Sequence, residues 1–328
     1  MAQKIAIFQI NRNGSIHQLG AKQVFSADAS TAIGGKYKIV TPLVVDKTSY
    51  LLAYDPASGK ANVLRQTSAE PWLASAGTVN VGTALDAIEP LILGNQPHLM
   101  CYGAKAGAGP NGDARRDGSF MFFPVSEPLK LGVGYAFRRT HELGVTKDFT
   151  TVKTFTSAGQ VVFLGYNAAT GYVAMFTLSI TATSPQFTPP GTPPLFALSR
   201  WSHPWAPGWT RFAFFQLGGE NFFFKTNTVT PNVNIDHVLD DVTMGTVEVS
   251  SQMQKRYPDA MNLDIVQPLT LGDGDPYFIG YKSDGTIGIN RFHIDCQGWT
   301  EAASFAAPAG ATQVVPSFVG DQAYVVVC

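Results

Sequence analysis

The sequence predicts an all-β fold arranged as a six-bladed β-propeller, on the evidence of a strand pattern, a repeat and the relation between the chain ends. Residues 266–299 alternate large and small side chains and are divided by turns rich in Gly, Asp and Pro, as short antiparallel strands are. A Val-x-Pro opening begins this unit, and it or a variant occurs with third positions 42, 90, 154, 214, 268 and 316. Copies of about 50 residues made of strands indicate one sheet repeated around an axis.

An aromatic residue recurs at a fixed distance from each opening. It lies twelve or thirteen residues after the third position, as Tyr54, Tyr102, Tyr166 and Tyr281, with Thr226 and Cys328 as substitutes. Recurrence favours packing between neighbouring sheets. The alternative is that the tyrosine hydroxyls, with Lys282 beside Tyr281, line a shared binding face.

The two ends of the chain are complementary fragments of the repeat. Residues 4–20 carry two strands without an opening, whereas the last copy has the opening and stops at Cys328. Together they would complete one blade and close the ring, leaving no free strand edge. We therefore expect six blades in a single domain of residues 1–328. Seven blades is the alternative, because residues 5–9 also resemble the aromatic-bearing strand.

Composition narrows the function classes. The chain has 14% charged residues and a net charge of −1, which gives no electrostatic footprint for nucleic acid. Its three cysteines (Cys101, Cys296 and Cys328) show no disulfide or metal spacing, and we expect no cofactor and no metal. The first residues resemble a strand rather than a signal peptide, and no segment is long enough to span a membrane. We expect a cytoplasmic protein, or one released without a signal peptide.

Two segments interrupt the repeat. Residues 103–119 form a Gly- and Ala-rich insertion that contains Arg115 and Arg116, and it joins two strands. It lacks the strand-to-helix context of a phosphate-binding loop, so a mobile surface loop is the favoured interpretation. Residues 184–194 are too rich in proline for a strand and are expected to connect two blades.

The most aromatic segment, residues 200–209, is the main candidate site. We expect it to be a loop, restricted by its prolines, that exposes aromatic faces and hydrogen-bonding groups, as sugar binding requires. The candidate residues are Trp201, His203, Trp205, Trp209 and Arg211. For Trp209 the alternative is a structural role at the start of the next strand.

Catalytic signatures are absent from the sequence. The six histidines occupy different places in the repeat, and His237 and His293 have carboxylates nearby, which more often marks polar strand ends than acid–base chemistry. No known nucleophile or metalloprotease motif occurs. We therefore predict no catalytic residues.

Two segments resemble the repeats of lectin-type β-propellers, the tachylectin-like and fungal or bacterial sugar-binding group. They are GWTRFAFFQLGG, and YFIGYKSDGTIGINRFHID followed by a tryptophan. The resemblance implies a multivalent, non-catalytic lectin with a glycan or other small-molecule ligand. The chain departs from six-bladed fucose lectins, which place an Arg, a Glu and a Trp in nearly every blade, because no such set recurs here.

Two other functions stay open. A propeller enzyme (a cyclase, isomerase or lyase) would use a pocket in the central channel or at a blade top, where Glu89, Lys153 and Gln267 share one position of the opening strand. A platform for protein interactions is the third, and the formation of a homo-oligomer is left open.

Overall fold

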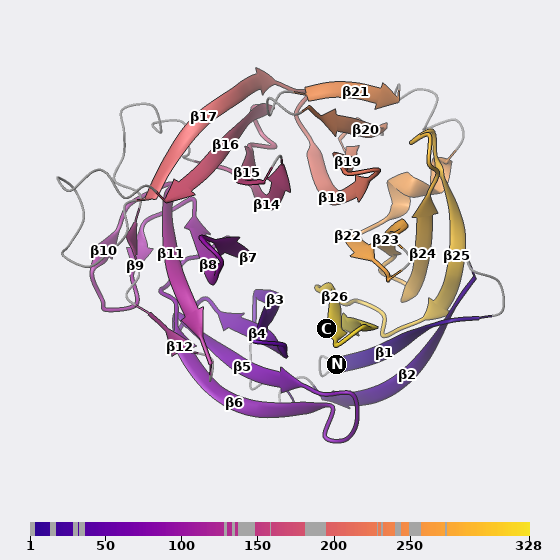
Figure 1. Ribbon diagram of the computed structural model, residues 1–328, viewed down its shortest axis with the longest axis horizontal. Helices are drawn as coiled ribbons and strands as arrows, with labels where there is room; N and C mark the ends of the chain where they lie inside the picture. Colours follow the sequence, from indigo (N-terminus) through magenta and orange to yellow (C-terminus); the bar gives the residue numbers. More distant parts are fainter. Residues whose placement is uncertain are drawn as a thin grey trace.

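The computed structural model describes residues 4–13, 18–28, 32, 37–127, 130–132, 135–136, 148–157, 159–180, 195–227, 229–230, 232–239, 244–248, 257–272 and 274–328. In these residues six antiparallel sheets surround a central axis, so the predicted six-bladed β-propeller is confirmed (Figure 1). We number the blades along the chain from the first that is continuous in sequence.

Five blades are continuous, and their strands follow one another from the axis outward (Figure 1). The first blade contains β3 (Ile39–Val45), β4 (Thr48–Asp55), β5 (Lys60–Gln66) and β6 (Leu73–Asn80). The second contains β7 (Ala87–Leu93), β8 (Gln96–Gly103), β11 (Ser119–Ser126) and β12 (Lys130–Leu131), and β13 (Tyr135–Ala136) also pairs with β11. The third contains β14 (Thr151–Ser157), β15 (Gln160–Tyr166), β16 (Tyr172–Ile180) and β17 (Leu195–Pro204). The fourth contains β18 (Trp209–Leu217), β19 (Glu220–Asn227), β20 (Asn232–Val238) and β21 (Met244–Glu248), and the fifth β22 (Ile265–Thr270), β23 (Pro276–Tyr281), β24 (Thr286–Phe292) and β25 (Trp299–Ala306).

The sixth blade is assembled from both ends of the chain. Its inner strands are β26 (Val314–Val319) and β27 (Gln322–Val327), and its outer strands are β1 (Lys4–Arg12) and β2 (Leu19–Asp28). β1 pairs with β27 in a register that sets Ala6 opposite Val327. Because β1 is the third strand of this blade, it does not begin a seventh blade, and that alternative is wrong.

In the four openings that contain a proline, this residue lies on the strand nearest the axis. Pro42, Pro90, Pro268 and Pro316 stand on β3, β7, β22 and β26, each of which is the edge strand of its sheet. An edge strand has a neighbour on one side only, so a residue without an N–H group costs little there. The prolines also leave these inner edges with fewer donors for unwanted strand pairing.

The recurrent tyrosines join each blade to the next. Their hydroxyls accept a hydrogen bond from the backbone N–H three residues before the next blade's opening valine or its equivalent, and we call this contact the tyrosine bridge. The donors are Leu85 to Tyr54 (3.1 Å), Phe149 to Tyr102 (2.9 Å), Trp209 to Tyr166 (3.2 Å) and Ala311 to Tyr281 (2.8 Å). Three of the hydroxyls also donate to loop carbonyls, those of Gly82, Ala206 and Pro308.

Two blade boundaries depart from this pattern. Between the sixth and first blades the tyrosine comes from the other side, because Tyr37 lies beside Cys328. Between the fourth and fifth blades Thr226 stands in place of the tyrosine, and its Oγ1 is buried without a hydrogen-bond partner in the described part of the chain. The fourth and fifth blades are therefore the pair that lacks a tyrosine contact of this kind.

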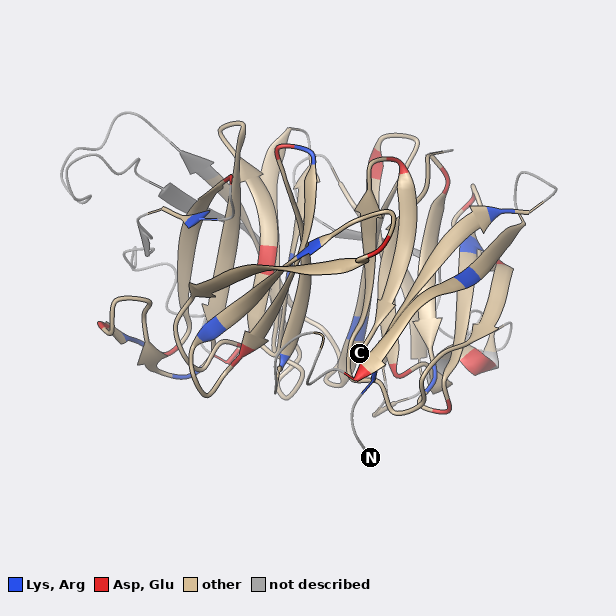
Figure 2. Cartoon of the chain, turned by 90° about the horizontal axis from the view of Figure 1, so that it is seen from below, with Lys and Arg blue, Asp and Glu red and all other residues tan. Residues whose placement is uncertain are grey.

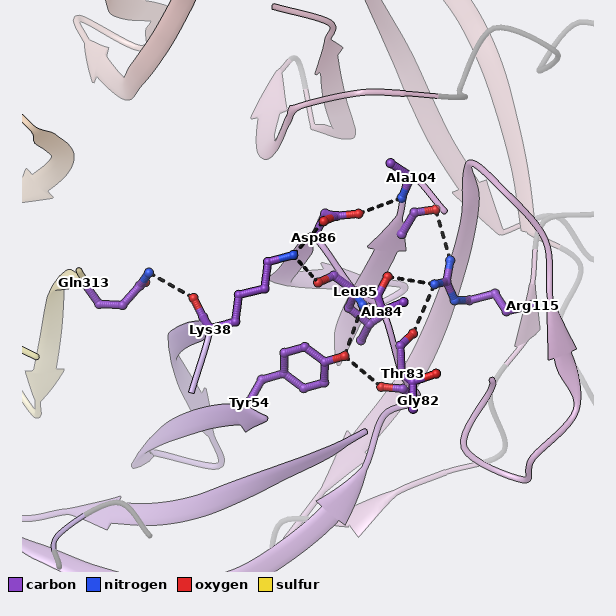
Figure 3. A network of polar contacts seen from close by, with 11 residues as sticks. Lys38, Tyr54, Gly82, Thr83, Ala84, Leu85, Asp86, Ala104, Arg115 and Gln313 are labelled. Carbon is purple, nitrogen blue, oxygen red and sulfur yellow. Dashed lines mark hydrogen bonds and ion pairs between the residues drawn. The ribbon is translucent and has the colours of Figure 1, made fainter. Parts of the chain in front are cut away.

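The insertion is packed against the blades and is not the mobile surface loop that the sequence suggested. β9 (Gly107–Ala108) and β10 (Ala114–Arg115) form a small hairpin in it. Arg115 is 5% exposed. Its guanidinium donates to the carbonyls of Gly103 (3.0 Å), Thr83 (3.1 Å) and Ala84 (2.8 Å) and to Ser119 Oγ (3.2 Å), as Figure 3 shows in part. One buried cation thus satisfies carbonyls on both sides of the boundary between the first two blades.

Charged residues of both signs are interspersed along the strands and loops (Figure 2), in keeping with the near-zero net charge. Among the described residues no helix combines the length and the hydropathy that crossing a membrane requires.

Candidate functional site

Residues 200–209, the most aromatic segment, are mostly strand rather than the expected loop. Trp201 and His203 belong to β17, the outermost strand of the third blade, where His203 is exposed and the side chain of Trp201 lies outside the described residues. Trp205 follows the strand and is half-buried, and Trp209 begins β18 with 5% exposure. The backbone N–H of Trp209 donates to the hydroxyl of Tyr166. This contact agrees with the alternative that Trp209 has a structural role at the start of its strand.

Trp205 covers a cation supplied by the protein itself. The ammonium of Lys225 lies 3.6 Å from the Trp205 ring centroid and 4.7 Å from that of Trp209. It pairs with Asp236 at 2.5 Å, and both side chains are almost fully buried. Desolvation lowers the pKa of Lys225, and the carboxylate of Asp236 opposes this effect. The inner face of Trp205 is therefore occupied and is not available to a sugar ring.

The tyrosines proposed as binding residues are packing residues in the structure. Tyr54, Tyr102, Tyr166 and Tyr281 are at most 1% exposed, and the hydroxyl of each makes a tyrosine bridge. A glycan in contact with these hydroxyls would have to displace the loops between blades. Of the two interpretations of the recurrence, the structure agrees with packing.

A pocket of about 330 Å³ opens where the tyrosine bridge is missing, and we call it the inter-blade pocket. One side is the segment before the fifth blade, which includes the short 3₁₀ helix η2 (Pro258–Asn262). The other side is one face of β23, β24 and β25. Its lining comprises Tyr257, Asp259, Ala260, Leu263, Phe278, Gly280, Lys282, Thr286, Gly288, Asn290, Trp299 and Glu301.

Aromatic rings form one wall of the inter-blade pocket. Tyr257 and Trp299 stack with centroids 3.9 Å apart and planes at 20°. The Tyr257 hydroxyl accepts the backbone N–H of Trp299 at 3.0 Å, which fixes the pair. Phe278 meets Trp299 edge-on at 5.2 Å. This wall is apolar and is held by ring contacts and one hydrogen bond.

Two glycines line the pocket, and at Gly280 an added Cβ would lie 2.8 Å from Leu263, which already occupies that space. Gly280 and Gly288 lie opposite each other on β23 and β24, where other blades place Ala53 with Asn62 or Cys101 with Met121. A Cβ at Gly288 would come 3.3 Å from Asn290 and 3.5 Å from Glu301. Any larger side chain there would extend into the space between these polar groups. The residue of the fourth blade that corresponds to Gly280 is Lys225. Its side chain fills the space at the boundary between the third and fourth blades.

The inter-blade pocket carries charges of both signs. Lys282 and Asn290 are half-buried, whereas Glu301, Asp259 and Thr286 are exposed. The ammonium donates, the carboxylates accept, and the amide does both. The set suits a neutral ligand that has several hydroxyl groups.

The central channel holds a second, larger cavity of about 480 Å³, which we call the central cavity. All six blades line it through the residues of β3, β7, β14, β18, β22 and β26 or those just before them. Glu89, Lys153 and Gln267 line it, as their shared repeat position suggested. Arg211 lies here too, where its Nε donates to the Asp264 carbonyl at 2.9 Å.

Other chemistry-bearing residues lie apart from these spaces. His237 stacks on Phe222 and approaches Glu220 at 3.4 Å, and His293 bonds Thr300 at 2.8 Å, so both have strand-end roles. In the described ranges no cluster of three or more His, Cys, Asp or Glu could hold a metal. The three cysteines are buried and free, and burial raises the pKa of Cys296 to about 11.

Of the ten residues predicted for the site, Lys282 lines the inter-blade pocket and Arg211 the central cavity. Tyr257, Asn290, Trp299 and Glu301 were not predicted. A signal for them exists in the sequence. Thr226 breaks the tyrosine repeat at the same boundary where two glycines face each other across neighbouring strands, and such breaks of a local rule often mark sites.

No protein-family model and no curated protein matches the chain. Solved structures do. The chain is similar to the SapL1 lectin in complex with alpha methyl fucoside, at 12% identity over 90% of this chain and 89% of that one, with a TM-score of 0.52. It is also similar to a candidate 6-phosphogluconolactonase from Bacteroides fragilis, at 11% identity over 99% of this chain and 87% of that one, with a TM-score of 0.51. At these identities the likeness shows a β-propeller fold that binding proteins and enzymes share.

Proposed function

We propose that the protein binds carbohydrate without transforming it, and that the inter-blade pocket is the binding site. The observation that carries this proposal is the combination of a fixed aromatic wall with polar groups of both charges in one open space of about 330 Å³. Aromatic faces suit the C–H side of a sugar ring, and Lys282, Asn290 and Glu301 can serve its hydroxyls. The likeness in fold to a lectin solved with a fucoside supports the class of ligand and not the identity of the sugar.

Multivalency would come from association of several chains. Where a tyrosine bridge is present, it closes the described boundary between the two blades. In the fourth blade, Lys225 fills the space that corresponds to the inter-blade pocket. A single weak site per chain gains avidity when chains associate, because the second contact becomes intramolecular. This proposal connects the predicted glycan ligand with the homo-oligomer that the sequence left open.

A steric block of the pocket floor tests the proposal. A glycan array with the wild-type protein identifies a ligand, and calorimetry then compares Gly288→Leu with Gly272→Leu. The Gly272 position is exposed and has no atom near an added Cβ, so it is a matched control in the same blade. We expect Gly288→Leu to weaken binding at least tenfold, which is about 1.4 kcal/mol, and the control to bind normally. Equal binding by both variants, or an array without hits, refutes the proposal.

A further inference from the structure

The charged groups at one end of the central cavity are already paired across blade boundaries. Lys38 of the first blade bonds Asp86 of the second at 2.7 Å and the Leu85 carbonyl at 3.0 Å (Figure 3). The second oxygen of Asp86 accepts the N–H of Ala104 at 2.8 Å. Arg211 bonds the carbonyl of Asp264, whose carboxylate accepts the N–H of Ser283 at 2.6 Å. These groups are occupied in holding the blades together.

The middle of the central cavity has unused hydrogen-bonding capacity. Lys153 Nζ and Glu89 Oε1 pair at 2.9 Å, and their side chains remain 30% and 18% exposed. Within the described part of the chain neither makes a further hydrogen bond from its ammonium or carboxylate. Gln267 is half-buried and its amide makes none there. β22, which carries Gln267, faces β7, which carries Glu89, across the axis (Figure 1).

Charge balance restricts the ligand. The cavity is lined by three cations (Lys38, Lys153 and Arg211) and three anions (Asp86, Glu89 and Asp264). An ion of one sign would have to break a pair and leave its partner uncompensated in a partly buried place, which is costly. A hydroxyl group needs no such exchange. It can donate to the free oxygen of Glu89, accept from Lys153, or do either with the amide of Gln267.

The rest of the wall combines apolar residues with threonines and Gln313. Pro42, Pro90, Pro268, Pro316 and Phe214 line the same space. They offer contacts to the C–H faces of a ring. A volume of about 480 Å³ falls within the usual range of small-ligand pockets, about 300–1,000 Å³.

We infer that the central cavity is a second binding site, for a neutral, hydroxyl-rich molecule of monosaccharide or cyclitol size held by Glu89, Lys153 and Gln267. The inference is independent of the inter-blade pocket, since the two spaces share no lining residue. It is a binding role and requires no bond to be made or broken.

Saturation-transfer NMR tests the inference with named probes: myo-inositol, sorbitol and methyl glycosides as neutral polyols, and glycine, acetate and ammonium as charged ones. The main variant is Gln267→Leu, because the side chain of this residue makes no hydrogen bond within the described ranges whose loss would unfold the protein. The matched control is Thr270→Leu, on the same strand but exposed and outside the cavity lining. Gly288→Leu serves as a control for the inter-blade pocket.

We expect at least one neutral probe to bind the wild-type protein and to lose tenfold or more in affinity in Gln267→Leu. Thr270→Leu and Gly288→Leu should retain that binding. The inference is overturned if no neutral probe binds, if Gln267→Leu binds as well as wild type, or if only charged probes bind. Turnover of a probe that depends on Glu89 would also overturn it, in favour of an enzyme. Loss of binding in Gly288→Leu alone would assign the ligand to the inter-blade pocket instead.

Discussion

At the scale of single residues, the phenol oxygen of each recurrent tyrosine supplies a contact that its ring cannot. The ring of each recurrent tyrosine fills space between blades, as a phenylalanine would. Its hydroxyl, however, is the acceptor for a buried backbone N–H at the entry of the next blade, such as that of Leu85. Without this acceptor the N–H group would be buried with no hydrogen-bond partner, and its desolvation would destabilise the fold.

We therefore expect Tyr54→Phe to lower the free energy of unfolding by about 1–3 kcal/mol, the cost of a buried unsatisfied donor. The control is Thr226→Val at the equivalent position of the fourth blade, where the buried hydroxyl has no hydrogen-bond partner among the described residues. This change should be neutral or stabilising. Urea unfolding of both variants measures the difference, and equal losses would show that the hydroxyls do not join the blades.

The buried thiols predict a pH dependence. Burial raises the pKa of Cys296 to about 11 and that of Cys328 to about 12, from 9.0. The folded state thus keeps protons that the unfolded state loses, so stability is fully present below pH 9 and falls as the pH rises towards 11. We expect Cys296→Ala to lose less stability than wild type between pH 8 and pH 10. Identical losses in the two proteins would mean that Cys296 titrates normally.

At the scale of elements, the insertion of the second blade depends on one arginine. Arg115 satisfies three carbonyls and a hydroxyl from its buried position. We expect Arg115→Met to cost at least about 2 kcal/mol, since hydrogen bonds to charged groups are the stronger ones. Arg116 is exposed, so Arg116→Met should stay within about 0.5 kcal/mol of wild type. Thermal unfolding of the pair, with proteolysis at residues 103–119, measures the contribution of Arg115, and equal melting temperatures of the two variants would contradict this prediction.

The sequence predicted the blades well because their pattern is local and repeated. Period-2 alternation, the edge proline and the tyrosine spacing all express the same contacts in each copy. The insertion was misjudged because Gly and Ala are typical of loops, whereas the order of this segment comes from Arg115 reaching carbonyls about thirty residues earlier in the chain. No local pattern reports such a contact.

The site was harder to predict for the same reason. Trp201, Trp205 and Trp209 were conspicuous as a cluster in sequence, but Trp205 covers Lys225 and Trp209 is buried. Tyr257 and Trp299 are 42 residues apart and become neighbours only when the fifth blade folds against the segment before it. Lys282 was among the predicted residues because it adjoins a repeat residue, and the other residues that line the pocket lie on strands of the fifth blade or before it.

At the scale of the whole molecule, the ring separates two kinds of space. The described boundaries between blades are filled by tyrosine bridges or by aromatic clusters, and the inter-blade pocket lies beside the boundary that lacks a tyrosine bridge. The axis, where the edge strands meet no partner, keeps a cavity lined by charges that balance. The central cavity depends on the ring being closed, because all six blades line it, whereas the inter-blade pocket is lined by the fifth blade and the segment before it.

Closure rests on β1, which pairs with β2 on one side and with β27 on the other. Deleting residues 1–20 removes β1 and reduces the sixth blade to β26 and β27, with an open strand edge. We expect this variant to aggregate or to lose cooperative unfolding.

Ala6 lies opposite Val327, so the chain ends are adjacent, and a circular permutant is a matched control. Joining Cys328 to Lys4 by a short linker and opening the chain at residue 310 keeps every strand. The permutant should unfold cooperatively near the wild-type melting temperature. A soluble deletion variant with an unchanged melting temperature would show that the ring is held without β1.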